Sequence, residues 1–133
     1  MQINVTLDAE VLLNPEEALG HILISDDDGG EISGQDVWVD DWLMALVEGV
    51  QALSRGEQEF ASEIMSEPHP LIFKSYGRGL SISFAGKSVV GDDLHVFGRE
   101  LKAEIRRVMS EFGEGAEFRP DSFWVELRQY ARA

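Results

Sequence analysis

The sequence predicts an α+β fold in which an antiparallel β-meander packs, as a single pair of layers, against a central amphipathic helix and a long second helix. Apolar residues in 36–53 recur at the alternating four-and-three spacing of one helical face. Residues 71–90 contain short β-type runs separated by turn residues. A second apolar stripe with helical spacing runs through residues 94–112. Together these observations indicate two helices lying on a sheet.

The chain of 133 residues is expected to form one domain, 1–133, because it contains no internal repeat or linker. It has no cysteine, which excludes disulfides and thiolate metal sites. Its first residues have no basic segment typical of a signal peptide, and no apolar run approaches the roughly 18 residues of a membrane helix. We therefore expect a cytoplasmic protein.

The first third of the chain is predicted to contain strands and one short helix. Residues 2–7 alternate apolar and polar side chains, as a half-buried strand does. Asn14 followed by Pro15 is typical of a helix start, and Gly20 limits that helix to a short one. Residues 21–24 favour a strand, and residues 25–31 a turn or loop.

The start of the central helix has two interpretations. Either Asp36 caps the helix, or residues 37–39 end a strand and Asp40 is the cap. Gly56 suits the position just after the helix. Leu43 and Leu46 are expected to face the meander. The side expected to face water carries Asp40, Met44, Glu48 and Gln51.

Residues 57–66 fit a short helix or an edge strand, and the strand is favoured. The meander follows as three strands at 71–76, 80–85 and 88–90, in which Ile82 or Phe84 should contact the central helix. Gly86 and Lys87 are predicted to form a two-residue hairpin loop.

The second helix is predicted to begin after Asp92 or Asp93. Its charged side chains alternate in sign, which is typical of a solvated face. Residues 123–131 fit a helix about as well as a strand, and the start signal of Asp121 and Ser122 favours the helix.

No motif of enzyme chemistry is present. His21, His69 and His95 have no metal-binding spacing, so a zinc site would need remote carboxylates. Counted from Asp26, a calcium loop would place Glu31 at its glycine position and Val37 at its bidentate acid. We therefore predict no enzymatic activity, no stoichiometric metal and no cofactor.

The charge is strongly asymmetric. The formal net charge is −14, and residues 1–73 hold 16 acids and a single base, Arg55. The remaining residues hold ten bases and nine acids. Such a surface repels nucleic acid and anionic membranes and attracts a basic protein. The alternative interpretation is that the acidic residues only keep the protein soluble.

The predicted partner-binding surface combines an acidic loop with the start of the central helix. Charges at the rim of an interface mainly change the association rate, so tight binding also needs an apolar anchor. Trp38 is the expected anchor. The full set of predicted partner-binding residues is Asp26, Asp27, Asp28, Glu31, Trp38, Asp40 and Asp41.

The order of elements, the Trp-x-x-x-Trp-Leu pattern of Trp38, Trp42 and Leu43, and the Glu67–Pro68 step before the meander resemble immunity proteins of bacterial polymorphic toxin systems. The resemblance implies a protein that binds a cognate toxin and occludes its active site or substrate path, with no catalytic residues. The acidic half then suggests a toxin with a basic substrate groove, such as a nuclease or deaminase. The alternative is a non-enzymatic adaptor or structural subunit that binds a basic protein. The oligomeric state is open.

Overall fold

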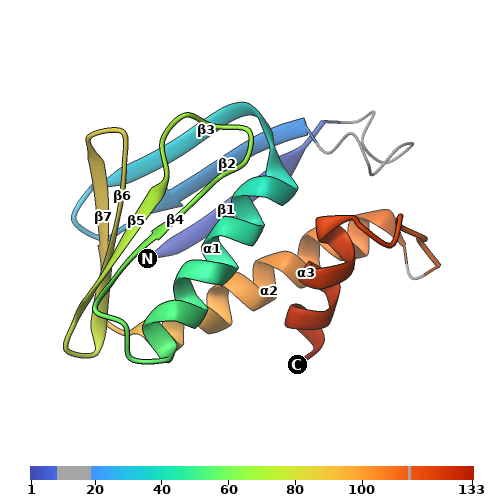
Figure 1. Ribbon diagram of the computed structural model, residues 1–133. Coiled ribbons are helices and arrows are strands. Elements are labelled where there is room, and N and C mark those ends of the chain that lie inside the picture. Colours follow the sequence, from blue (N-terminus) through green and yellow to red (C-terminus); the bar gives the residue numbers. More distant parts are fainter. Residues whose placement is uncertain (9–18, 114) are drawn as a thin grey trace.

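A computed structural model describes residues 1–8, 19–113 and 115–133, and it forms an α+β fold with two antiparallel sheets and three helices (Figure 1). The helix start predicted at Asn14 lies outside the described residues. The first sheet has the strand order β1 (Gln2–Leu7), β2 (Leu19–Ser25), β3 (Glu31–Trp38). Alternate residues of β1 are buried, which confirms the predicted half-buried strand.

The second sheet contains the predicted meander and one strand more. Its order is β4 (Glu59–Ser62), β5 (Leu71–Tyr76), β6 (Gly79–Phe84), β7 (Lys87–Gly91). The strand interpretation favoured for residues 57–66 is confirmed, because β4 pairs with β5. The buried hydroxyl of Ser62 donates a hydrogen bond of 2.6 Å to the carbonyl oxygen of Ala45, which fastens this edge strand to the central helix.

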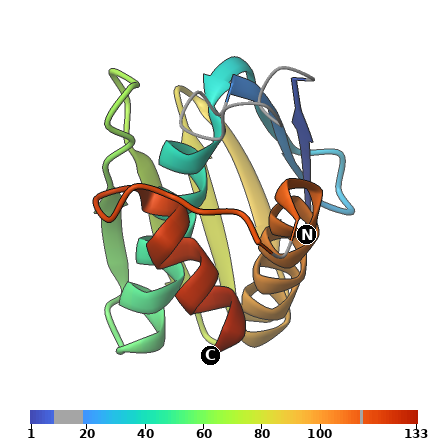
Figure 2. The same cartoon turned by 90° about the vertical axis from the view of Figure 1, so that its right-hand side faces the viewer.

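Three helices complete the fold: α1 (Val39–Ser54), α2 (Leu94–Phe112) and α3 (Phe123–Arg132). Helix α1 contacts strands of both sheets on one side and α2 and α3 on the other. Figure 2 shows the red helix α3 in front of α1 and the orange helix α2 to the right of α1. The central helix is therefore an inner element of the fold. None of the helices formed by the described residues is long and apolar enough to cross a membrane.

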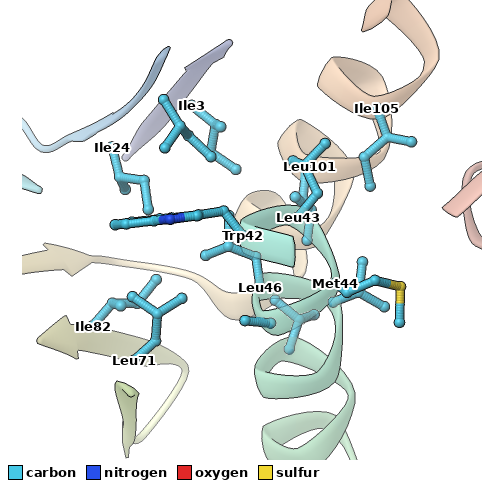
Figure 3. Packing of buried hydrophobic residues seen from close by; sticks show 14 of the residues in the cluster. Ile3, Ile24, Trp42, Leu43, Met44, Leu46, Leu71, Ile82, Leu101 and Ile105 are labelled. Carbon is cyan, nitrogen blue, oxygen red and sulfur yellow. The ribbon is translucent and has the colours of Figure 1, made fainter. Parts of the chain in front are cut away.

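The core is built around α1 (Figure 3). Leu43 and Leu46 are fully buried in the same cluster as Ile82, and the ring of Trp42 lies 4.9 Å from that of Phe84. Residues of the first sheet, such as Ile24, join this cluster. The prediction that α1 lies against the meander is confirmed, and the first sheet is a second support for the helix.

The close approach of α1 to the second sheet depends on Gly49. A Cβ atom at this position would lie 2.1 Å from Cε1 of Phe73. No side-chain carbon tolerates such a distance, so only glycine allows the ring of Phe73 to lie against the helix backbone.

The start of α1 differs from both interpretations of the sequence. Strand β3 runs through Trp38 directly into the helix, and Trp38 occupies the N-cap position without a side-chain capping bond. Neither Asp36 nor Asp40 is the cap. Asp40 and Asp41 lie in the first turn, where the helix dipole favours negative charge.

The expected exposed side of α1 is only partly exposed. Met44 was predicted to face water but is buried, because α3 packs across that side of the helix. Glu48 and Gln51 remain exposed, as predicted. The helix ends as expected, with Gly56 at a φ of 101° just after it.

The hairpin between β6 and β7 turns one residue earlier than predicted. Phe84 pairs with Lys87, so the loop residues are Ala85 and Gly86, with φ values of 49° and 85°. Positive φ at both positions defines the turn type whose twist matches the flanking strands, which is why Ala85 adopts a conformation unusual for alanine.

The two remaining helices begin as the sequence predicts. The side chain of Asp93 accepts hydrogen bonds from the backbone N–H groups of His95 and Val96 at the start of α2. Residues 123–131 form a helix, and the hydroxyl of Ser122 accepts from the backbone N–H of Trp124.

Candidate functional site

The structure divides the predicted partner-binding surface into two parts. The β2–β3 turn, which carries the acidic loop, lies beside β7, and the start of α1 lies at the opposite end of β3 (Figure 1). Glu31 begins β3 and Trp38 ends it. At about 3.3 Å per residue, seven residue steps separate the two by roughly 23 Å.

In the acidic loop, Asp26 has a structural role. Its Oδ1 accepts hydrogen bonds from the backbone N–H groups of Asp28 (3.0 Å) and Gly30 (2.7 Å), and its Oδ2 accepts from that of Val90 (2.8 Å). These bonds, with that of Val90 contributing most, hold the pKa of Asp26 below its ordinary value. The carboxylate is therefore engaged within the fold and connects the two sheets.

The exposed acids of the loop have neighbours that sequence reasoning missed. Asp27 lines a hollow of about 300 Å³ together with Asp92, Asp93 and the exposed Val96. Asp92 and Asp93 were considered only as helix caps, because the sequence gives no sign that the start of α2 meets the β2–β3 turn. Asp27, Asp28, Asp92 and Asp93 make this end of the molecule, here called the turn surface, acidic, and Met1 at the N-terminus lines the same hollow.

The start of α1 forms the second part, here called the helix-start surface. Trp38 is 38% exposed. Asp40 and Asp41 are half-buried and line a hollow of about 300 Å³ with Met65, which is 79% exposed. Arg119 and Asp121, which form an ion pair at 3.6 Å, line the same hollow, so three acids face one base there. Met65 was not predicted, and the only signal in the sequence is a large apolar residue in the loop after β4, two residues before Glu67 and Pro68.

Several charged side chains of the second half are used inside the fold. Glu104 of α2 accepts a hydrogen bond of 2.6 Å from the backbone N–H of Val5, and Arg107 donates to the carbonyl oxygen of Val5. Arg107 also pairs with Glu104 at 2.7 Å. The two side chains thus cover the edge of β1, which corrects the prediction that the charges of this helix form only a solvated face.

Two further bases of α2 hold α3 in place. Arg106 donates to the carbonyl oxygen of Ala131 at 2.8 Å, and Lys102 donates to that of Ala133 at 3.3 Å. Cations are favourable at the C-terminal end of a helix. These three bases of α2 therefore have structural roles, and the net negative charge comes from residues 1–73, which hold 16 acids and one base.

Metal-ligating side chains meet at one place among the described residues. Asp8, His21 and Asp36 each offer one ligand atom, and these atoms all lie within 4.8 Å of one another. The sequence separates these residues by 13 and 15 positions, a spacing that matches no motif, so only the pairing of the strands reveals the group.

Comparison with known proteins gives no match to a protein family, to a curated protein or to a solved structure.

Proposed function

We propose that this chain is an immunity-type protein that binds a cognate, basic bacterial toxin and occludes its active site or substrate groove. It acts by binding alone and catalyses no reaction. The observation that carries the proposal is the combination, at the helix-start surface, of exposed apolar side chains with acids.

Trp38 and Met65 are large apolar side chains that the fold leaves in water, 38% and 79% exposed. Tryptophan and methionine are enriched at protein interfaces, and tryptophan often contributes most of the binding energy. Asp40 and Asp41 lie two and three residues after Trp38 and line the hollow that contains Met65. An apolar anchor with an acidic rim fits a partner whose contact surface is basic.

The turn surface supports the same partner through long-range attraction. Asp27, Asp28, Asp92 and Asp93 raise the association rate with a basic protein, and they exclude acidic competitors. A standard interface covers about 800 Å² of each partner, a patch roughly 30 Å across. Both surfaces therefore fit within one interface that follows β3.

The test begins with the identity of the partner. The tagged protein is purified from its native host, and the proteins that remain bound at moderate salt are identified by mass spectrometry. The proposal expects a basic protein that is toxic when expressed alone and harmless when co-expressed with this chain. A stable complex with a non-toxic basic protein would instead support an adaptor or structural subunit.

Two variants then connect the toxin to the surface. Trp38→Ala should weaken protection in co-expression, whereas Lys74→Ala, an exposed position on β5, should not. If a toxin is found but both variants protect equally, the chain is an inhibitor that uses a different surface.

A further inference from the structure

We propose that Asp8, His21 and Asp36 form a binding site for a divalent first-row transition-metal ion, for which Zn²⁺ is the best-fitting example. The site offers one imidazole nitrogen and two carboxylate oxygens, all within 4.8 Å of one another. The inference is independent of the proposed toxin-binding function. It replaces the prediction of no metal, because the structure supplies the remote carboxylates that a histidine of this chain would need.

The three ligands come from adjacent strands of the first sheet. Asp8 follows β1, where its backbone N–H donates to the carbonyl oxygen of Leu19 at 3.1 Å. His21 lies on β2 opposite Thr6 of β1. Asp36 lies on β3, the other neighbour of β2. The pairing of the strands therefore positions the ligands.

An irregularity in β3 brings Asp36 to His21. Gly20 pairs with Val37 and Ile22 with Gly34, so both Gln35 and Asp36 lie opposite His21. Such a bulge redirects a side chain, and here Asp36 has a φ of 52°, a conformation that favours glycine. The backbone N–H of Asp36 donates a long hydrogen bond of 3.4 Å to Nδ1 of His21, and an ion that used Nδ1 would take the place of this bond.

The charge of the group also favours a cation. Two carboxylates lie close together, and residues 1–54 contain no lysine or arginine. The ion pairs formed among the described residues involve neither Asp8 nor Asp36. Like charges at this separation repel, and a divalent ion between them removes the repulsion.

The ligand types select the class of ion. Imidazole suits zinc and similar transition metals, whereas Mg²⁺ and Ca²⁺ prefer oxygen ligands alone. Zinc bonds of about 2.0–2.2 Å place ligand atoms roughly 3.3–3.6 Å apart. Each pair of ligand atoms must therefore close by no more than about 1.5 Å, which half-buried and exposed side chains can do. Three protein ligands leave at least one position for water.

The first experiment is calorimetric titration of chelator-treated protein with ZnCl₂, in the presence of excess Mg²⁺ to saturate weak binding to the acidic surface. We expect one saturable site per chain. His21→Ala and Asp36→Asn should each weaken it at least about tenfold, the lower end of what loss of a supporting group costs a metal site. The matched control, Asp27→Asn with Asp28→Asn, removes two charges elsewhere and should leave it intact. Absence of a saturable site, or equal weakening in the control, overturns the proposal.

A second variant separates the loss of a ligand from misfolding. Asp36→Gly removes the carboxylate but suits the positive φ, so without metal it should unfold at the same or higher denaturant concentration than the parent. Zn²⁺ should raise the midpoint of the parent and not that of the variant. A rise of equal size in both would show that the ion binds elsewhere.

The position of the ion can be read directly by NMR with Mn²⁺ as a paramagnetic probe. Amide signals of β2 and β3 around His21 and Asp36 should broaden first. Broadening centred on Asp27, Asp92 and Asp93 would place the ion at the turn surface and contradict the proposal.

Discussion

The carboxylate of Asp26 accepts a hydrogen bond of 2.8 Å from the backbone N–H of Val90, 64 positions further along the chain. Val90 lies on β7, whose other side pairs with β6, so the carboxylate takes the place of a further strand at this edge. One of the acids predicted to bind a partner is thus part of the framework that joins the two sheets. This relationship determines which acids can be changed without changing the fold.

Asp26→Asn should destabilise the protein at neutral pH. An amide accepts through only one oxygen, so one of the three backbone N–H groups now served by the carboxylate meets an N–H donor instead. Because the folded pKa of Asp26 lies below the ordinary value of 3.8, the stabilisation is complete above that value and is lost as the pH falls through the folded pKa. Urea midpoints of parent and variant should therefore differ at pH 7 and converge in strong acid. A constant difference at all pH values would show that the charge has no part in it.

Asp27→Asn with Asp28→Asn should leave stability unchanged and slow association with the cognate basic partner several-fold at low salt. Both side chains are exposed. Near 0.5 M salt, where the Debye length is about 4 Å, the effect should nearly disappear. Stopped-flow association rates at two salt concentrations measure it. If the variant associates as fast as the parent at low salt, the turn surface is not part of the interface.

Trp38→Ala should mainly increase the dissociation rate of the same complex. An aromatic anchor at the centre of an interface typically contributes about 2 kcal/mol or more, which is roughly a thirtyfold increase in the dissociation constant. Surface plasmon resonance separates the two rates, and a circular dichroism melt controls for folding. If only the association rate changes, Trp38 lies outside the buried part of the interface.

Gly49→Ala should destabilise the protein although alanine is the better helix former. The intrinsic gain of up to about 1 kcal/mol is opposed by overpacking against Phe73, which typically costs about 1–3 kcal/mol. Gly98 of α2 is the matched control, because a Cβ there would meet only Val50 Cγ1 at an ordinary 3.6 Å. Gly98→Ala should therefore stabilise. The denaturant midpoint should fall in Gly49→Ala and rise in Gly98→Ala. If both variants were stabilised, the packing of Phe73 on α1 would be refuted.

Leu46→Ala should cost about 2–5 kcal/mol of unfolding free energy, because its side chain is fully buried in the shared core. Ser81→Ala on β6 should cost about 1 kcal/mol or less, since it removes a single oxygen. Equal denaturant midpoints for the two variants would contradict the position of α1 in the core.

The features that the sequence predicts well are those set by neighbouring residues. The strands 2–7 and 80–85, the stripe of α2 and the cap at Ser122 depend on periodicity and capping within a few positions. They are confirmed almost residue by residue. The hairpin at Ala85 was misplaced by one position because glycine is the more usual residue at either loop position.

The features that could not be predicted depend on contacts between distant segments. Met44 is buried because α3, far along the chain, lies across α1. Asp26 is engaged because β7 reaches the β2–β3 turn, and Asp36 meets His21 because β3 contains an irregularity. Each depends on tertiary geometry that no local pattern records.

The three tryptophans occupy different environments, and this gives the protein an intrinsic optical reporter. Trp42 and Trp124 are 1% and 0% exposed, whereas Trp38 is 38% exposed. A soluble quencher such as acrylamide therefore reaches Trp38 in the folded chain and leaves the emission of the other two nearly unchanged. A partner that covers the helix-start surface should protect Trp38 from the quencher, so the loss of quenching reports binding without any label. Quenching that remains in the Trp38→Phe variant would show that Trp42 or Trp124 has become accessible through partial unfolding.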